Sequence, residues 1–191
     1  MKNILILGGD MRFITVANLL AGDGYNVSVL GFKKSASFDG RISFFTNLPE
    51  AVERCDAIVA PLPVTKDNIT VYAPFSINEI YIDDVLSYAG ERPVFCGMAT
   101  GEFIKSAEKF DVRLIDYFKS EYLTVLNCVP TTEGAISIAI ENTPFTLFGS
   151  KTLVMGFGRV GRHLSKTLAA FGADVSVEAR KESDLAWICA L

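Results

Sequence analysis

A glycine-rich turn near the carboxyl end of the chain constrains the fold more than any other feature. Gly156, Gly158 and Gly161 form a G-x-G-x-x-G pattern. The apolar run at 153–155 before the turn predicts a strand, and a helical pattern follows it to about residue 171. A second strand is expected at 174–177. Strand, glycine turn, helix and strand follow one another in the order that a dinucleotide site requires.

Each glycine of the turn has a physical role in such a site. The first allows the tight turn, the second lets the backbone approach a pyrophosphate, and the third lets the helix pack closely on the strand. The pyrophosphate would lie on free N–H groups at the start of the helix, where the helix dipole favours an anion. The sequence therefore predicts a nucleotide site at Gly156, Gly158, Arg159, Val160 and Gly161. The alternative is a βαβ turn that binds no ligand.

The overall composition argues against several classes of protein. The chain has 191 residues, of which 50% are hydrophobic, and its formal net charge is −4. Because no basic run is present, we expect no nucleic-acid partner. No apolar run approaches the length of a membrane span and the first residues do not form a signal peptide, which predicts a cytoplasmic protein without a membrane partner. Four scattered cysteines and one histidine offer no convincing metal site.

The charge is unevenly distributed along the chain. Residues 149–191 hold six Lys or Arg and four Asp or Glu, whereas the rest of the chain is acidic overall. The end that carries the glycine turn is thus the positive end, which suits a phosphate ligand.

The first 118 residues alternate between strand and helix patterns. Strands are expected at 3–7, 26–30, 42–45, 56–60, 93–97 and 112–115, and helices at 13–20, from 47, at 83–89 and at 100–110. Residues 65–80 show no clear pattern. Regular alternation of this kind predicts an α/β domain with a Rossmann-like parallel sheet and helices on both of its faces.

The first strand also leads into a glycine turn, at Gly8 and Gly9, but this turn lacks the third glycine. Asp10 is expected to cap the following helix and to occupy the anion position with its own carboxylate, so no second cofactor site is predicted. Arg12 follows at the carboxyl end of the strand. There it could hold a dicarboxylate through a bidentate pair, the alternative being a surface arginine on the first helical turn.

A helical segment is expected to connect two domains. Residues 117–127 are predicted to be helical, with a break at 128–130, and Pro130 with a capping threonine predicts a new helix start. This second helix is apolar nearly all round and is expected to be buried. Thr131 and Glu133, at its start, are expected to face the cleft between the domains. The expected organisation is an α/β domain at 1–128, a connecting helix at 129–148 and the first half of a dinucleotide-binding Rossmann domain at 149–191.

The residues after the second strand of the glycine-turn unit bear on the cofactor. A site that prefers NAD carries an acid there, which binds the ribose hydroxyls. Counting from Gly172 places Ala179 at that position, followed by Arg180 and Lys181. A missing acid beside two cations favours the 2′-phosphate of NADP. If the strand ends one residue sooner, however, Glu178 would bind the ribose and NAD would be preferred.

Four stretches taken together carry a more specific signal. The glycine turn alone is shared by very many enzymes, and the other three stretches make the match specific. The stretches are 6–12 (Ile-Leu-Gly-Gly-Asp-x-Arg), 61–64 (Pro-Leu-Pro-Val), 127–134 (Asn-x-Val-Pro-Thr-x-Glu-Gly) and 156–161 (Gly-x-Gly-Arg-x-Gly). On these four stretches, the chain resembles the family of the dipicolinate synthase A subunit, and the similarity covers essentially its whole length.

The resemblance implies a nicotinamide-dependent oxidoreductase of sporulation. Such an enzyme would form dipicolinate from a dihydrodipicolinate-type intermediate, together with the B subunit of dipicolinate synthase. Arg12, Asp10, Thr131 and Glu133 are then the candidate residues for a small dicarboxylate substrate, and Arg180 and Lys181 join the glycine turn in binding the cofactor. The two-domain plan is also similar to that of the formate/glycerate dehydrogenase group, and a homo-oligomer is compatible with it.

One departure from the family concerns length. Family members continue well beyond the position at which this sequence stops, and residues 149–191 supply only half of a dinucleotide-binding domain. We therefore expect this chain not to catalyse hydride transfer, and we expect an exposed Trp187 and Ile188 to promote association. No general base is identified, so the catalytic residues stay unassigned. Two other functions are considered: an NADP-binding regulatory or scaffold subunit without chemistry of its own, and another dehydrogenase of the formate/glycerate dehydrogenase-like group.

Overall fold

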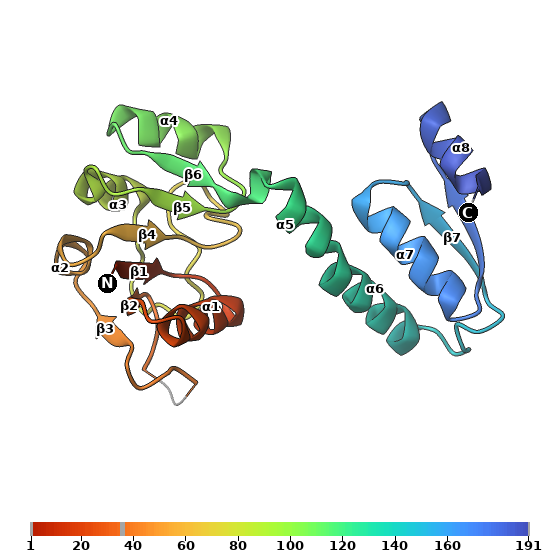
Figure 1. Ribbon diagram of the computed structural model, residues 1–191, viewed down its shortest axis with the longest axis horizontal. Coiled ribbons are helices and arrows are strands. Elements are labelled where there is room, and N and C mark those ends of the chain that lie inside the picture. The colour runs from red at the N-terminus through yellow and green to blue at the C-terminus, as the bar shows by residue number, and fades with distance from the viewer. Residues whose placement is uncertain (1, 35–36, 191) are drawn as a thin grey trace. The chain divides into compact units, whose positions relative to one another are not determined.

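The computed structural model describes residues 2–34 and 37–190, which form two compact units (Figure 1). The first unit is Met1–Lys119 and the second is Ser120–Leu191. The sequence placed the end of the first domain at residue 128. The boundary lies earlier because the helical residues after Ser120 contact α7 (Arg159–Ala170) of the second unit rather than forming a free connection.

The first unit alternates between strands and helices in the way that the sequence predicts. For most of these helices and strands, the first and last residues differ from the expected ones by no more than two positions. The elements are β1 (Asn3–Leu7), α1 (Met11–Gly22), β2 (Asn26–Leu30), β3 (Ser43–Phe45), α2 (Leu48–Glu53), β4 (Ala57–Val59), α3 (Ile82–Ala89), β5 (Val94–Cys96), α4 (Gly101–Lys109), β6 (Leu114–Asp116) and the 3₁₀ helix η1 (Tyr117–Lys119).

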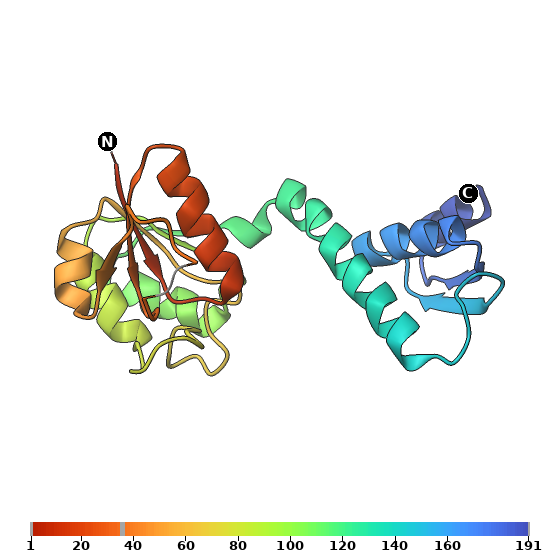
Figure 2. The same ribbon diagram turned by 90° about the horizontal axis from the view of Figure 1, so that it is seen from below.

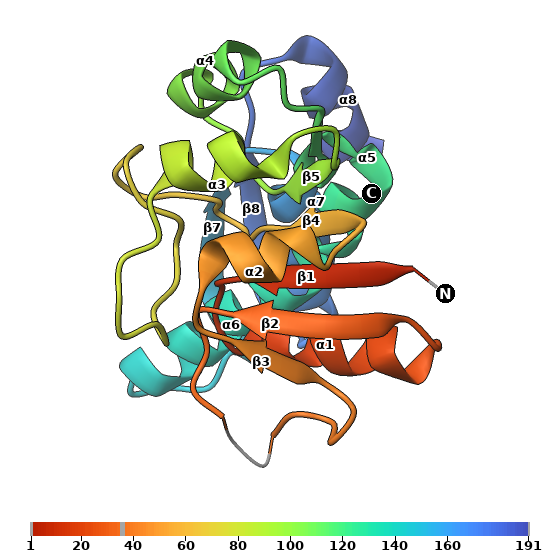
Figure 3. The same cartoon turned by 90° about the vertical axis from the view of Figure 1, so that its left-hand side faces the viewer.

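The strands of the first unit form one parallel sheet in the order β3-β2-β1-β4-β5-β6. Figure 3 shows β3, β2, β1, β4 and β5 side by side in this order. The direction of the strand order reverses between β1 and β4, so the loops that follow these two strands start next to each other. In open α/β sheets this switch point, at the carboxyl ends of the strands, is where ligands bind.

Helices cover both faces of this sheet, as the strand pattern predicts. α1 packs on one face through Phe13, Ile14 and Ala17, and α2 to α4 pack on the other. Figure 2 shows α1 and α2 on opposite sides of the strands. Leu5 and Ile6 of β1 are fully buried, one in each of the two apolar clusters. The central strand is therefore apolar on both sides, as a parallel sheet between two helix layers requires.

The second unit contains the predicted strand–turn–helix–strand motif. β7 and β8 pair in parallel over five residues, and α7 forms the connection between them. A small apolar core lies between this sheet, α7 and α6, formed by Ile136, Leu147, Val154 and Leu168. The elements of the unit are α5 (Glu121–Leu126), α6 (Cys128–Asn142), β7 (Lys151–Met155), α7 (Arg159–Ala170), β8 (Asp174–Glu178) and α8 (Glu182–Ala190).

The predictions for the start of the long helix were wrong. α6 begins at Cys128, and only Asn127 interrupts the helical path from α5. Pro130 lies inside the first turn, where a missing N–H costs no helical hydrogen bond. Thr131 therefore does not cap the helix. Its hydroxyl instead donates to the backbone oxygen of Asn127, one turn back.

The expectation that this helix is buried was also wrong. Cys128, Thr132 and Ile136 are the buried residues of α6 and lie one helical turn apart, whereas Ile138 and Ile140 are exposed. An apolar composition all round a helix does not determine how many of its faces find a partner. Here α7 covers one face of α6.

Taken as one helical stretch, Glu121–Asn142 is long and apolar enough to cross a membrane. The sequence does not predict such a segment, because polar residues interrupt the apolar ones along this stretch. Length and composition alone do not distinguish a membrane span from a core helix of a globular domain.

Gly161 sets the distance between α7 and β7. A Cβ atom at this position would lie inside van der Waals contact of the Gly156 carbonyl oxygen and 3.0 Å from its carbonyl carbon. Both of these atoms belong to the backbone and cannot rotate away. Only glycine therefore fits here, which is the role expected of the third glycine.

We predict that Gly161→Ala lowers the free energy of unfolding of the second unit by about 1–3 kcal/mol, because the methyl group forces α7 away from the turn. Gly134→Ala is the matched control, since Gly134 lies in α6 and a Cβ there meets no atom within 4 Å. The control should stabilise the unit by about 0.5–1 kcal/mol. Denaturant titration followed by circular dichroism and by Trp187 fluorescence measures both. Equal stabilities of the two variants would contradict the close approach at Gly161.

Candidate functional site

The glycine turn leaves the start of α7 open to a ligand. Gly156 has a φ of +108°, a conformation that favours glycine, and its N–H pairs with the Glu178 carbonyl at 2.8 Å. Gly158 is the N-cap residue of α7, and no side chain caps the helix. A Cβ at Gly156 or Gly158 would meet no atom within 4 Å. The first N–H groups of α7 thus face space into which an anion can approach.

The start of α1 in the first unit is different, although it also follows a strand and two glycines. Asp10 caps this helix, and its carboxylate accepts from the backbone N–H of Arg12 at 3.1 Å. The N–H groups of Gly8 and Gly9 donate to the carbonyls of Leu30 and Tyr72. The prediction that this turn is occupied by its own carboxylate is confirmed.

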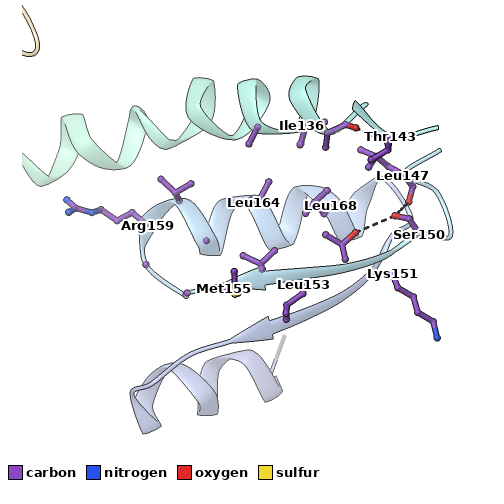
Figure 4. Close-up of a pocket in the computed structure, with 18 of the residues that line it drawn as sticks. Ile136, Thr143, Leu147, Ser150, Lys151, Leu153, Met155, Arg159, Leu164 and Leu168 are labelled. Carbon is purple, nitrogen blue, oxygen red and sulfur yellow. Dashed lines mark hydrogen bonds between the residues drawn. The ribbon is translucent and has the colours of Figure 1, made fainter. Parts of the chain in front are cut away.

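Two cavities flank the glycine turn of the second unit. The larger has a volume of about 820 Å³ and forms a groove between α6, α7 and the edge of β7 that faces away from β8. Figure 4 shows Ile136 of α6 and Leu164 and Leu168 of α7 along this groove. Its lining is mainly apolar, and no strand within the described residues pairs with this edge of β7. The apolar part of this groove suits protein segments, and Gly158 and Arg159 line it at the start of α7.

The smaller cavity, of about 560 Å³, is the better candidate for a nucleotide. It lies between the turn and the residues that follow β8. Charged groups of both signs line it, including Glu178, Arg180 and Lys181. β8 runs through Glu178, so the strand does not end before this residue. Glu178 nevertheless lines the cavity, which brings the acid and the two cations to one site.

Asp184 also lines this smaller cavity, and Arg162 holds its carboxylate. Arg162 donates to Asp184 Oδ1 at 2.8 Å and to the Phe157 carbonyl oxygen at 3.1 Å. Its guanidinium also lies over the Phe157 ring, 5.0 Å from the ring centroid. Arg162 is therefore engaged in holding the turn to α8, and Arg180 and Lys181 are the remaining cations that line this cavity.

Arg159 extends from the first turn of α7 (Figure 4). Its Nη1 donates to Glu121 Oε2 at 2.9 Å and to Thr124 Oγ1 at 2.7 Å, both on α5. Neither partner was identified from the sequence, because a link between residues so far apart depends on how α5 packs beside α7.

The structure brings Asp10 and Arg12 together at the switch point of the first sheet. Arg12 Nε and Nη2 both donate to the Asp10 carboxylate, at 2.8–3.2 Å, and Nη2 also donates to the Leu62 carbonyl oxygen at 2.7 Å. Only Nη1 lacks a partner among the described residues. These hydrogen bonds lower the pKa of Asp10. A carboxylate ligand would therefore meet one free nitrogen of Arg12 rather than a bidentate edge.

Thr131 and Glu133 belong to the second unit, whereas Asp10 and Arg12 belong to the first. Both side chains are exposed on α6. Thr131 bonds its own helix backbone, and Glu133 lies in the second turn rather than the first. Neither residue contributes to the two cavities beside the glycine turn.

Comparison with known proteins identifies one matching family and a relative that is similar over nearly the whole chain. Residues 3–118 match the family described as the N-terminal domain of the dipicolinate synthase A subunit. The A subunit of dipicolinate synthase from Bacillus subtilis (strain 168) is 29% identical over 189 residues, which are 97% of this chain and 63% of that protein.

Solved structures agree with this. The crystal structure of the B. subtilis protein has a TM-score of 0.83 at 28% identity, over 99% of this chain and 64% of that chain. The corresponding protein from Bacillus halodurans gives 0.87 at 27% identity, over 99% and 65%. Phosphoglycerate oxidoreductase from Vibrio cholerae gives 0.51 at 15% identity, over 100% and 59%, and shows the fold alone. The chain thus spans slightly less than two thirds of the length of its relatives.

The Asp10–Arg12 pair should make the stability of the first unit depend on pH. The pKa of Asp10 lies below its ordinary value of 3.8 in the folded state, so the pair stabilises the first unit above that value and loses its effect as pH falls through the folded pKa. Asp10→Asn should therefore be less stable than the wild type at neutral pH, and the difference should shrink below about pH 4.

Urea unfolding at several pH values measures this difference. Glu108→Gln removes an exposed carboxylate that has no ion pair among the residues described, and it should track the wild type throughout. A stability difference for Asp10→Asn that is independent of pH would contradict the prediction.

Proposed function

Because the chain belongs to the dipicolinate synthase A-subunit family, we propose that it binds a nicotinamide dinucleotide and a small dicarboxylate for the oxidation that forms dipicolinate. The observation that carries the proposal is the uncapped start of α7 beside an open cavity. The corresponding position of the first unit is closed by Asp10. Of two similar βαβ turns, one therefore offers free N–H groups to a pyrophosphate and the other does not.

The residues around the turn fit a dinucleotide. Gly156 and Gly158 leave room for the pyrophosphate, and Gly161 permits the close packing that such a turn requires. Arg159 and Val160 follow in the first helical turn, so their backbone N–H groups would face the phosphates. The adenosine end would lie in the cavity lined by residues 178–181. When bound, the oxidised cofactor supplies a hydride acceptor.

We assign NADP as the preferred cofactor, since Arg180 and Lys181 can pair with a 2′-phosphate. NAD is the alternative because Glu178 lines the same cavity and could accept hydrogen bonds from ribose hydroxyls. The two assignments differ in the sign of the charge that the cavity presents to the 2′ position.

A dicarboxylate substrate is assigned to the switch point of the first sheet. Arg12 would hold one carboxylate through Nη1, while Asp10 and the Leu62 carbonyl keep its Nε and Nη2 in place. Conversion of a dihydrodipicolinate-type intermediate to an aromatic dicarboxylate removes one hydride and one proton. An oxidised dinucleotide is the acceptor that this hydride requires. Sporulation as the setting and the B subunit of dipicolinate synthase as the partner belong to the same proposal.

A second candidate function is a dinucleotide-binding scaffold whose partner protein carries the chemistry. It is favoured because the first unit contains no histidine and its buried Cys96 and its Tyr117 are not available as bases. Burial raises the pKa of Cys96 to about 12, and the buried Tyr117 hydroxyl donates to the Ala60 carbonyl oxygen. The one histidine of the chain, His163, lies in the second unit, where its Nδ1 is buried without a partner among the described residues.

An activity measurement separates the two functions. A chain extended to the length of its relatives is mixed with NADP⁺ and a dihydrodipicolinate-type substrate, in the presence and absence of the B subunit, while dinucleotide absorbance is followed. We expect reduction of the dinucleotide without the partner. Reduction by the B subunit alone, measured in a third mixture that lacks this chain, would favour the scaffold.

Calorimetric titration of the chain with NADPH and NADH tests the cofactor. We expect NADPH to bind more tightly, and Arg180→Ser combined with Lys181→Ser to weaken it on the order of tenfold by removing charge-assisted hydrogen bonds. NADH should change little. Gly158→Ala is the control for the pyrophosphate end, and it should weaken both dinucleotides because its methyl group fills the space of the ligand. Clearly tighter binding of NADH would overturn the NADP assignment.

A further inference from the structure

Arg159 is held from α5 in a way that leaves one edge of its guanidinium available. Nη1 donates to both Glu121 and Thr124. Nε and Nη2 have no partner among the residues that the structure describes. These two nitrogens form the side-on edge with which arginine binds a phosphate or carboxylate through two parallel hydrogen bonds.

The two partners of Nη1 differ in burial. Thr124 is 8% exposed, whereas the Glu121 side chain is 74% exposed. An ion pair in such an exposed position is screened by water and salt and fixes its partner weakly. The threonine hydroxyl is the contact that is protected from solvent, so it determines the position of Arg159 more than the carboxylate does.

The orientation of the Thr124 hydroxyl is also fixed. Its Oγ1 lies 3.1 Å from the Ser120 carbonyl oxygen and 3.0 Å from that of Glu121, both of which accept its proton. A hydroxyl has one proton, and here it is directed to the backbone of its own helix. The lone pairs of Oγ1 are therefore free to accept, and Arg159 Nη1 lies 2.7 Å from Oγ1. Thr124 is a pre-oriented acceptor.

We propose that Thr124 is a positioning residue, which holds Arg159 at the start of α7 so that Nε and Nη2 present a bidentate edge to the pyrophosphate of the dinucleotide. The inference rests on the proposed function, because it assumes that a pyrophosphate binds at the glycine turn. Thr124 itself does not touch the ligand. It lowers the entropy that Arg159 would lose on binding, since the long side chain is already held in one geometry.

A double-mutant cycle tests this proposal through binding rather than activity. The variants are Thr124→Val, Arg159→Ala and the double variant. The probes are whichever of NADPH and NADH the wild type binds more tightly, and adenosine, which lacks the pyrophosphate. Thr124→Val should weaken dinucleotide binding about three- to tenfold, the effect of one hydrogen bond, and should leave adenosine binding unchanged. In the Arg159→Ala background the same substitution should have no further effect.

Two more variants serve as controls. Thr124→Ser keeps the hydroxyl and should restore dinucleotide binding to within about twofold of the wild type. Thr167→Val removes a hydroxyl of α7 that also donates to its own helix backbone, at His163, and that does not contact Arg159. It should bind the dinucleotide as the wild type does. Circular dichroism melting curves establish that each variant is folded at the titration temperature.

The outcomes separate this inference from the function on which it rests. Equal weakening by Thr124→Val in the presence and absence of Arg159, or no weakening at all, would overturn the positioning role while dinucleotide binding itself stands. A wild-type chain that binds neither dinucleotide would overturn the proposed function, and the positioning role with it.

Discussion

The hydrogen-bonding needs of a helix start govern the candidate sites of both units. Backbone N–H groups in the first turn have no partner within the helix and must find an acceptor elsewhere. α1 and α7 both follow a parallel strand and a glycine turn, so both face this requirement at the carboxyl edge of a sheet. Asp10 satisfies it at α1 from within the chain. At α7 no side chain does, so these N–H groups are the ones that the proposed pyrophosphate would meet.

Closing the first turn with Asp10 has a second effect on the first unit. The carboxylate that caps α1 also binds Arg12 through two nitrogens, and Arg12 in turn reaches the Leu62 carbonyl in the loop after β4. One carboxylate thus ties two neighbouring loops together at the switch point of the sheet. A rigid edge of this kind is a suitable surface for a ligand because few groups there have to be ordered on binding.

The sequence predicted those features that depend on neighbouring residues along the chain. The apolar runs of β1, β2 and β4, the cap at Asp10 and the glycine turn with its strand and helix are all local patterns, and all are present. Predictions that required knowledge of packing were less successful. The apolar character of α6 says nothing about which face is covered, and Pro130 fits inside a first turn as well as at its beginning. The contacts of Arg159 with Glu121 and Thr124, and of Arg162 with Asp184, join distant residues and left no local signal.

The small size of the β7–β8 sheet has a thermodynamic consequence for the second unit. Two paired strands are marginal in water on their own. Among the described residues, the buried cluster that supports them consists of Ile136, Leu147, Val154 and Leu168. Little of the stability of this unit therefore resides in the sheet. A ligand that binds only the folded unit raises the free energy of unfolding of this unit by mass action. In such a unit, the fraction of molecules with a ligand at the glycine turn and the fraction that is folded are linked, so each rises with the other.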